Sequence, residues 1–505
     1  MDILDHILFG FGVAFQPLNL LFCFIGVLIG TLVGVLPGLG PVAAISLLLP
    51  ATFHAPPVAS IIMLSGIYYG AMYGGSTTSI LVNIPGEAAS VVTCFDGYQM
   101  ARKGRAGPAL GIAAFASFLA GTFGVVGLAF VAPPLAAMAL KFGPPEYFSL
   151  MVLGLTVLTF LAGGSMLKSL MMACVGVVIG NIGLDLITAQ PRFTFGLNIL
   201  LDGVGLVPLV MGLFGVSEVL LNVEQHLSER EVFKTKLKGL LPTLLDWKES
   251  TWPIVRGSVL GFFLGILPGG GAVISSFVSY GMEKRLSKNP DAFGKGAIAG
   301  VAGPEAANNA ATAGAFIPLL TLGLPSNAVM AILLGALMIY GMPPGPRLIT
   351  SHPQLFWGTI SSMYIGNAML LILNLPLIGL WVKILRIPYP ILFPLILLFC
   401  LIGAYSLNNN PAELGLMLFF GVLGYLMKKF KYDGAPLVLA MVLGPLMDQS
   451  LRQSLLMSGG SGMIFFARPI CLIIFAVVAI ILLLPVLPRI GRMRKTVREV
   501  DDIEG

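Results

Sequence analysis

Long apolar stretches without charged residues follow one another along this chain. No Asp, Glu, Lys or Arg occurs between His6 and Gly86, and further charge-free runs cover residues 106–140, 306–346, 348–382 and 469–488. Each run is long enough to cross a bilayer, because a membrane-spanning helix needs about 20 mainly apolar residues. The strands of a membrane barrel would alternate apolar and polar residues, whereas Cys471–Leu484 is continuously apolar. Since only helices or a closed barrel satisfy the backbone in lipid, the pattern predicts an all-α polytopic integral membrane protein.

The composition supports the same prediction, with 57% hydrophobic and 10% charged residues, against about 25% charged residues in soluble domains. The net charge of +6 comes from basic clusters between the apolar runs, at residues 102–105, 284–295, 428–431 and 489–498. Such clusters indicate membrane topology rather than binding to nucleic acid, because cytoplasmic loops are enriched in Lys and Arg. We expect all four clusters in the cytoplasm. No Lys or Arg precedes Arg102, so we predict an N-terminus outside, a C-terminus inside and an odd number of crossings.

Two parts of the sequence are similar to each other. Residues 26–42, GVLIGTLVGVLPGLGPV, align without a gap with residues 257–273, GSVLGFFLGILPGGGAV, at an offset of 231. Eight of the 17 positions are identical and five of these are Gly, whereas chance predicts about 0.25 shared glycines. Two further anchors follow in the same order, 84–88 with 324–328 at an offset of 240 and 107–110 with 345–348 at an offset of 238. The three ordered anchors predict an internal duplication.

A charged segment separates the two similar parts, with five acidic and five basic residues in 222–249. We therefore predict a first transmembrane repeat at 1–221, a charged cytoplasmic linker at 222–250, a second transmembrane repeat at 251–488 and a cytoplasmic tail at 489–505. If the first repeat begins outside and the linker is cytoplasmic, the two repeats cross the membrane in opposite directions. Inverted repeats of this kind are typical of secondary transporters.

Each repeat carries glycine at every fourth position just before a Pro-Gly segment. These glycines are Gly26, Gly30 and Gly34 in the first repeat and Gly257, Gly261 and Gly265 in the second. The spacing predicts close helix packing, which is the commoner role of such a face, rather than contact with a ligand. The Pro-Gly segments at 37–40 and 268–271 predict helix breaks, because Pro removes a backbone donor and Gly adopts backbone angles that other residues avoid.

The two arms around the second break are short. Pro253–Leu267 has 15 residues and Ala272–Arg285 has 14, fewer than the roughly 20 that a crossing needs. Both outer ends carry charges, so the arms predict a re-entrant hairpin that enters from the cytoplasm, and the repeat predicts a partner around residues 37–40 that enters from outside. A simple kink is the alternative, since Pro and Gly are frequent in membrane helices. The tips of such hairpins can offer N–H groups to an anion and C=O groups to a cation.

Two further segments, 74–83 and 304–312, place polar side chains in apolar surroundings. Their hydroxyl and amide groups suit a carboxylate or Na⁺, although single hydroxyls more often connect helices. Glu305 differs from them, because an ionised carboxylate at mid-membrane costs about 3 kcal/mol and usually marks an ion path; it can bind a coupling cation, relay a proton, or cap a helix near the interface. The candidate substrate- and ion-binding residues are Pro37, Gly38, Gly40, Ser76, Thr77, Thr78, Asn83, Pro268, Gly269, Gly270, Gly271, Glu305, Asn308, Asn309, Ser326 and Asn327.

The sequence lacks the motifs of common enzymes. It contains neither a GxxxxGK[ST] nucleotide loop nor an HExxH motif, and its five cysteines and four histidines are scattered. We therefore expect no catalytic residues, no cofactor, and no metal other than Na⁺. Without a nucleotide site, transport must draw on an ion gradient or on a separate ATPase.

The sequence resembles the large membrane subunit of the tripartite tricarboxylate transporters, the TctA family, over nearly its whole length. The resembling stretches are GVLPGLGP (34–41), IPGEAASVVTCFDGYQMARKGRAGPALG (84–111), KFGPPEYFSLMVLGL (141–155), GILPGGGAVISSF (265–277), FGKGAIAGVAGPEAANNAATAGAFIPLLTLGLPSNA (293–328) and GMPPGP (341–346). The family motifs include both Pro-Gly breaks and the segment of Glu305.

The resemblance implies a secondary transporter of the bacterial inner membrane that imports an organic di- or tricarboxylate such as citrate. It also implies coupling to Na⁺ or H⁺ and two partners, a small membrane subunit and a periplasmic solute-binding protein. The fold that we predict has two inverted repeats with re-entrant hairpins or broken helices, which frame the site and move as an elevator. The alternatives are a carboxylate/cation symporter that needs no binding protein and, in a different class, a membrane scaffold or an intramembrane enzyme.

Overall fold

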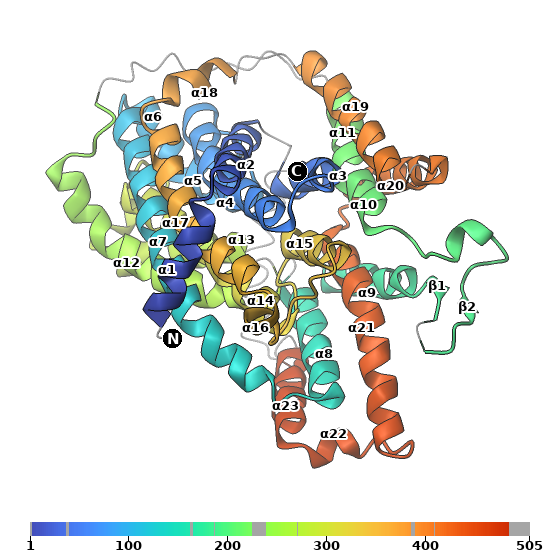
Figure 1. The fold of residues 1–505 in the computed structure, drawn as a ribbon. Helices are drawn as coiled ribbons and strands as arrows, with labels where there is room; N and C mark the ends of the chain where they lie inside the picture. The colour runs from blue at the N-terminus through green and yellow to red at the C-terminus, as the bar shows by residue number, and fades with distance from the viewer. Residues whose placement is uncertain are drawn as a thin grey trace.

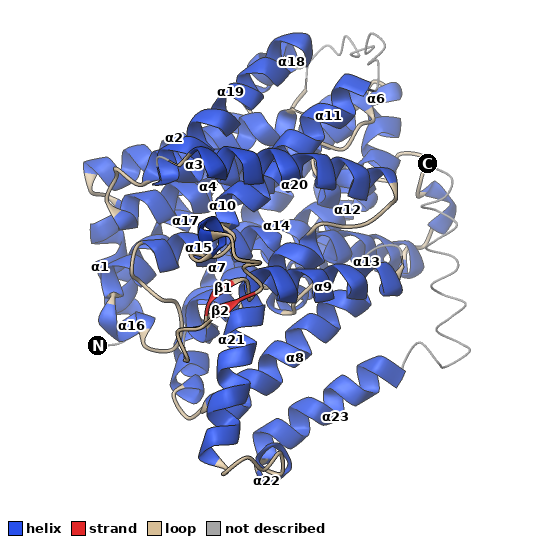
Figure 2. Cartoon of the chain, turned by 90° about the vertical axis from the view of Figure 1, so that its right-hand side faces the viewer, coloured by secondary structure: helices blue, strands red, loops and turns tan. Residues whose placement is uncertain are grey.

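The computed structural model describes residues 3–36, 40–161, 165–185, 187–224, 239–269, 271–384, 389–408 and 410–483. The predicted tail at 489–505 and residues 225–238 of the predicted linker lie outside these residues. Within them, helices form nearly all of the structure (Figures 1 and 2), which confirms the prediction of an all-α protein. The strands found in the described part, β1 (Gly183–Leu184) and β2 (Pro191–Arg192), pair antiparallel as one short hairpin.

The helices of the first half, in chain order, are α1 Ile3–Ala14, α2 Pro17–Val35, α3 Pro41–Thr52, α4 Pro57–Val82, η1 Ala88–Ser90, α5 Val91–Thr93, η2 Cys94–Tyr98, α6 Gln99–Arg102, α7 Ala106–Ala139, α8 Pro144–Leu161, α9 Met166–Gly180, η3 Asn198–Leu200, α10 Leu206–Val210, η4 Met211–Val216 and α11 Ser217–Glu224. Those of the second half are α12 Leu244–Ile266, α13 Gly271–Leu286, η5 Pro290–Ala292, α14 Ala299–Leu322, α15 Ala328–Ile339, α16 Leu348–Ser351, α17 Pro353–Asn374, α18 Ile378–Ile384, α19 Tyr389–Asn408, α20 Pro411–Lys429, α21 Ala435–Met457, α22 Ile464–Ala467 and α23 Pro469–Leu483.

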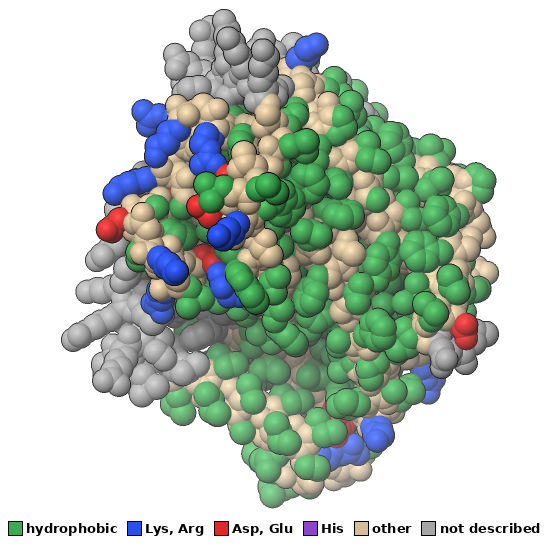
Figure 3. Space-filling view, turned by 90° about the vertical axis from the view of Figure 1, so that its left-hand side faces the viewer, with side chains coloured by type: hydrophobic (Ala, Val, Ile, Leu, Met, Phe, Trp, Pro, Cys, Tyr) green, Lys and Arg blue, Asp and Glu red, His purple; other side chains and the backbone are tan. Residues whose placement is uncertain are grey.

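Five of the described helices are long and apolar enough to cross a membrane: α2, α4, α7, α17 and α20. Hydrophobic side chains cover most of the face in Figure 3, and Lys and Arg side chains gather toward one edge of it. This arrangement is that of a multi-pass membrane protein. Two of the basic clusters adjoin each other, because the Lys103 ammonium group donates a hydrogen bond to the Lys295 carbonyl. The compartment that the two clusters face stays a prediction.

Both Pro-Gly segments interrupt helices, as the sequence predicts. Residues 36–40 separate α2 from α3, and residues 267–270 separate α12 from α13. Leu36 and Leu267, which precede the prolines, have extended backbone, because a following Pro disfavours the α-helical conformation. Gly269 then has a φ of 105°, which L-residues rarely adopt.

The arm before the second break is longer than predicted. α12 begins at Leu244, contains Pro253 in its interior and has 23 residues, but it is not among the helices that are both long and apolar enough to cross a membrane. It begins inside the predicted linker because Thr243 and Asp246 form a capping box: the Thr243 hydroxyl accepts from the Asp246 N–H, and the Asp246 carboxylate accepts from the Thr243 N–H. The predicted start of this arm at Pro253 is therefore wrong, whereas the re-entrant hairpin stays a prediction.

The glycine faces pack helix against helix, as predicted. A Cβ atom added to Gly26, Gly30 or Gly34 would lie 2.3, 2.6 or 2.3 Å from a backbone carbonyl oxygen of α4. These oxygens belong to Met63, Ile67 and Ala71, in the same order. A Cβ atom added to Gly257, Gly261 or Gly265 would lie 2.4, 2.0 or 2.2 Å from a backbone carbonyl oxygen of α14. These oxygens belong to Gly303, Ala307 and Ala311, in the same order. The glycines of the second set lie 231 residues after those of the first set, and the carbonyl groups that they approach lie 240 residues after those of the first set. These two distances along the chain are the offsets of the first two sequence anchors. The two halves thus pack their first long helices in the same register.

The next long helix of each half packs against the other half. α7 lies along α14, and α17 lies against α4 and α2. The four helices α4, α7, α14 and α17 therefore surround a common interior, to which both halves contribute.

A second group of helices, α8, α9, α21 and α23, extends to one side (Figure 1) and is joined to the β-hairpin by ion pairs. Asp185 pairs with Arg192 at 3.0 Å and with Arg452 at 2.9 Å, and Asp448 pairs with the same two arginines at 2.9 and 3.2 Å. The hairpin is therefore held to α21 by two carboxylates and two guanidinium groups.

This network is expected to stabilise the fold down to low pH. Hydrogen bonds from the Thr188 backbone and then the Ile187 backbone hold the pKa of Asp185 down to about 2. The pKa of Asp185 is lower in the folded state than in the unfolded state. Ionised Asp185 therefore adds to the free energy of unfolding above the pKa of an unfolded Asp, about 3.9, and this stabilisation disappears as the pH falls through about 2. We expect Asp185→Asn to lower the melting temperature at pH 7 by a few degrees and to have a smaller effect toward pH 2. Equal lowering at both pH values, measured by thermal unfolding, would contradict this.

Candidate functional site

A cavity of about 370 Å³ lies where the helix breaks of the two halves meet. Its wall includes the first residues of α3, α13 and α15, together with Glu87 and Ala88 at the start of η1. The first turns of α3, α13 and α15 contain no acidic residue, so the positive ends of three helix dipoles face the cavity without an acidic residue of their own. The wall positions correspond in the two repeats, because Glu87 and Ala88 align with Asn327 and Ala328 at the offset of 240.

Two polar side chains from opposite halves take different roles in this wall. Asn327 caps α15, since its Oδ1 accepts from the Met330 N–H at 3.0 Å, and its Nδ2 donates to the Tyr68 hydroxyl at 3.0 Å. Glu87 caps η1, since its Oε2 accepts from the Ala89 N–H at 2.8 Å. Its other oxygen, Oε1, is buried and has no hydrogen-bond partner among the described residues. Asn327 is therefore engaged on both atoms, whereas Glu87 offers a free acceptor.

The far wall of the cavity adds one lysine and two more carboxyl groups. Lys428 donates a hydrogen bond to Glu218, and Asp433 lies nearby on the same wall. Phe214, from the π-helical turn η4, adds an aromatic ring. Among the described lining residues, one positive side chain therefore faces three acidic ones, counting Glu87.

Glu305 is fully buried in the interior that α4, α7 and α14 share. Its Oε1 accepts from the Thr93 hydroxyl, and its Oε2 accepts from the Ser76 hydroxyl at 2.6 Å. The Ser117 hydroxyl and the Asn308 amide lie 3.4 and 3.5 Å from Oε2. All four partners are neutral. Because α14 begins at Ala299 and the side chain bonds to other helices, Glu305 does not cap α14.

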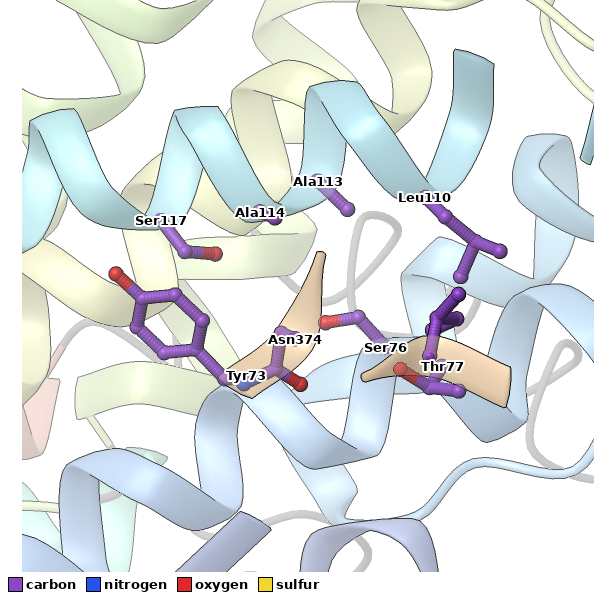
Figure 4. A pocket seen from close by; sticks show the side chains of 9 residues that line it. Tyr73, Ser76, Thr77, Leu110, Ala113, Ala114, Ser117 and Asn374 are labelled. Atoms are coloured by element: carbon purple, nitrogen blue, oxygen red, sulfur yellow. The ribbon is translucent and has the colours of Figure 1, made fainter. Parts of the chain in front are cut away.

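A small polar pocket of about 10 Å³ adjoins this cluster, and we call it the hydroxyl pocket. Its polar lining consists of Tyr73, Ser76 and Thr77 on α4, Ser117 on α7 and Asn374 at the end of α17. In Figure 4 the α7 side chains Ser117, Ala113 and Ala114 lie across from those of α4. Asn374 donates through Nδ2 to the Leu370 carbonyl at 2.9 Å, but its Oδ1 is buried without a hydrogen-bond partner in the described structure.

The predicted site residues are divided between these two places. Gly40 and Asn327 line the large cavity, and Gly271 is the first residue of α13, whose next residues also line it. Ser76 and Asn308 bond to Glu305, Thr77 lines the hydroxyl pocket, and Asn309 Nδ2 donates to the Ser117 hydroxyl at 2.8 Å. The structure thus brings the second polar segment against the first, and it places the two breaks around one cavity.

Other predicted residues have local roles or lie elsewhere. The Thr78 hydroxyl donates to the Val35 carbonyl at the end of α2 at 2.7 Å. Asn83 is exposed and has left-handed backbone at the end of α4. Gly269 donates its N–H to the Ser326 carbonyl at 2.7 Å, which ties the second break to the segment before α15. Pro268 lies beside Gly154 of α8. Pro37, Gly38 and Gly270 lie outside the described residues.

Sequence reasoning missed several residues of both places. Glu87 carried a signal, because the offset of 240 aligns it with Asn327. Lys428 was assigned to a basic topology cluster, yet it lines the cavity. Thr93, Ser117 and Asn374 are isolated polar residues in apolar sequence, and only the packing of distant helices brings them together.

The described residues contain no group of three or more His, Cys, Asp and Glu side chains arranged to hold a metal ion. Any ion in this interior would therefore meet mainly hydroxyl and amide oxygens. Oxygen ligands of this kind suit hard cations rather than zinc or copper.

Comparison with known proteins gives a consistent result. Residues 20–439 match the sequence model described as the tripartite tricarboxylate transporter TctA family. The chain is 53% identical over 502 residues, 99% of its length, to an Agrobacterium vitis protein described as an uncharacterized 52.8 kDa protein in the TAR-I ttuC' 3' region, all of which is covered. A second Agrobacterium vitis protein, described as an uncharacterized protein in the TAR-II ttuC' 3' region, is 52% identical over 242 residues, 48% of this chain and all of that protein. No solved structure matches the chain.

Proposed function

The chain belongs to the tripartite tricarboxylate transporter TctA family, and we propose that it is the permease subunit that imports an organic di- or tricarboxylate, citrate-like in chemistry, across the bacterial inner membrane. In this proposal a periplasmic solute-binding protein delivers the substrate, a small membrane subunit completes the complex, and a Na⁺ or H⁺ gradient drives import. The N-terminus would be periplasmic and the C-terminus cytoplasmic.

The single observation that carries the proposal is the cavity between the two helix breaks. Three helix N-termini without acidic residues in their first turns face it, and such termini bind carboxylates through free N–H groups and the helix dipole. Lys428 and the Asn327–Tyr68 pair add polar groups to an otherwise mainly apolar wall. Because the two repeats contribute separate helix ends, each end can receive one carboxylate of a substrate that has two or three.

The charge of the cavity supports coupling to a cation. With three carboxyl groups facing one lysine in the described wall, a dianionic substrate entering alone would increase the repulsion. A Na⁺ or H⁺ that enters with the substrate offsets this repulsion, so the substrate and the cation bind more favourably together than apart. Glu87 Oε1, which has no hydrogen-bond partner among the residues that the structure describes, can accept a hydrogen bond from a substrate hydroxyl or take up the proton itself.

The packing of the repeats supports a moving unit. Both halves place a broken helix on a long helix in the same register, and the large cavity lies between the breaks. We propose that the halves are inverted repeats and that the broken helices with the cavity move as an elevator relative to the remaining helices, exposing the site to each side in turn.

Uptake by proteoliposomes tests the function. The chain is reconstituted with its small membrane subunit and solute-binding protein, and uptake of radiolabelled citrate and a panel of other di- and tricarboxylates is measured under an inward Na⁺ or proton gradient. We expect at least one carboxylate to accumulate only when a gradient and both partners are present. If none moves under either gradient with all partners present, the proposal fails.

The same assay separates the alternatives. Uptake that is equally fast without the binding protein and the small subunit would favour a self-sufficient carboxylate/cation symporter. Chemical conversion of the added carboxylate without its movement would favour an intramembrane enzyme, and the absence of both would favour a scaffold.

A further inference from the structure

We propose that the hydroxyl pocket binds Na⁺, with Glu305 balancing the charge of the ion. The inference rests on the proposed function in that it assigns the coupling ion of the same transporter to a site. It is carried by three separate features of the described residues: the oxygen lining of the pocket, a buried amide oxygen that has no hydrogen-bond partner among them, and a buried carboxylate whose partners among them are neutral.

Three of the lining hydroxyls, those of Tyr73, Ser76 and Ser117, present acceptor atoms, because their protons are engaged elsewhere. The Tyr73 hydroxyl donates to Asn367, and the Ser76 hydroxyl donates to Glu305. Ser117 is oriented by two contacts, since it donates to Glu305 and accepts from Asn309. Lone pairs of these oxygens remain for an occupant, and a hard cation is bound through such oxygen atoms.

Asn374 provides the second feature. Its side chain is 95% buried, its Nδ2 is held by the Leu370 carbonyl, and its Oδ1 has no hydrogen-bond partner in the described structure. A buried polar atom without a partner costs about 1–3 kcal/mol, and a cation in the adjoining pocket would remove this cost. The pocket, about 10 Å³, has room for a single occupant no larger than water, which needs roughly 10–15 Å³. The pocket therefore admits one monovalent cation at most, and Na⁺ is the metal cation of the proposed function.

Glu305 provides the third feature. Its four hydrogen-bond partners are neutral hydroxyl and amide groups. Hydrogen bonds alone do not balance a buried charge, which normally requires a counter-ion. Ser76 and Ser117 connect the carboxylate to the pocket, so a Na⁺ there would lie one hydroxyl away from it.

The position of the pocket connects the ion to the substrate. One face of α4 provides Tyr73, Ser76 and Thr77 to the hydroxyl pocket, whereas Tyr68 and Met72 of the same helix line the large cavity. An ion that fixes α4 against α7 and α17 therefore also fixes one wall of the substrate cavity, which gives positive linkage between the two ligands.

Thermal unfolding of the purified full chain tests the site without transport or partners. Melting temperatures are measured by tryptophan fluorescence across concentrations of NaCl, KCl and choline chloride at matched ionic strength. Binding to the folded state alone raises the melting temperature with ligand concentration, so we expect a saturable rise with Na⁺ only. Thr77→Val, which deletes an oxygen while keeping the shape, and Asn374→Ala are each expected to raise the half-saturating Na⁺ concentration about tenfold, the effect of losing roughly 1.4 kcal/mol of binding.

Ser454→Ala is the matched control, because Ser454 is a buried serine of α21 whose hydroxyl donates to the Ser450 carbonyl of its own helix. It should leave the Na⁺ response unchanged. A rise that is absent, that K⁺ produces equally, or that persists unchanged in both Thr77→Val and Asn374→Ala overturns the site and leaves a buried water as its occupant. Uptake failure with an intact Na⁺ response would reject the proposed function alone, whereas uptake without that response would reject the site alone.

Discussion

Replacing Ala88 by Phe is expected to remove most carboxylate uptake while the protein remains folded. Ala88 is exposed at the start of η1 and lines the large cavity, so the added ring occupies the space proposed for the substrate. Excess volume in a packed site costs about 1–3 kcal/mol, and each 1.4 kcal/mol is about tenfold in binding. Uptake at low substrate concentration should therefore fall about 10- to 100-fold, as measured by initial rates in proteoliposomes.

Ala51→Phe is the control for this prediction. Ala51 is an exposed alanine near the end of α3 and does not line the cavity among the described residues. The same added ring should leave uptake close to the wild-type rate there, and both variants should keep the wild-type melting temperature within a few degrees. Wild-type uptake by Ala88→Phe would show that the substrate does not use this cavity.

The helix breaks were predictable because their cause is local. A proline after Leu36 or Leu267 restricts the backbone of the preceding residue, wherever the rest of the chain lies. The start of α12 was missed although its cause is also local. Thr243 and Asp246 have the spacing of a capping box, but the surrounding charges were interpreted as a solvated linker.

Ser76 and Asn308 were candidates from the sequence, but their contacts with Glu305, and the contributions of Thr93 and Ser117, could not be predicted. Ser76 is 229 residues away from Glu305 and Ser117 is 188 residues away, and Ser117 resembles any hydroxyl that connects helices. Their meeting depends on α7 packing along α14, which is a property of the whole fold. Glu305 itself was found because a carboxylate in apolar sequence is rare enough to stand out.

The internal repeat carried more information than was used. The offsets of 231 and 240 residues relate the sequence anchors of the two halves, and they also relate the close glycine contacts of one half to those of the other. Applied residue by residue, the second offset equates Glu87 with Asn327 and would have placed Glu87 in the site. Lys428 has no counterpart in the anchors. Its sequence context predicts a topology signal rather than a site residue, because two further lysines accompany it in the same basic cluster.

A methyl group at Gly261 is expected to prevent stable folding. Its Cβ would lie 2.0 Å from the Ala307 carbonyl oxygen and 2.7 Å from the Ala307 Cα, so α12 and α14 would have to separate. Backbone atoms cannot rotate away as a side chain can, and overpacking of this kind costs about 3 kcal/mol or more. We expect Gly261→Ala to give little monodisperse protein and a melting temperature lowered by at least several degrees, as measured by size-exclusion chromatography and thermal unfolding.

The same substitution at Gly281 provides the comparison, because an added Cβ there has no heavy atom within 4 Å among the described residues. Gly281→Ala lies in the interior of α13, where replacing Gly by Ala favours the helix by about 1 kcal/mol, so its stability should equal or exceed that of the wild type. Gly30→Ala should resemble Gly261→Ala, since its Cβ would lie 2.6 Å from the Ile67 carbonyl oxygen in the corresponding contact of the first half. If Gly261→Ala and Gly281→Ala proved equally stable, the close packing of α12 on α14, and with it the common register of the two halves, would be wrong.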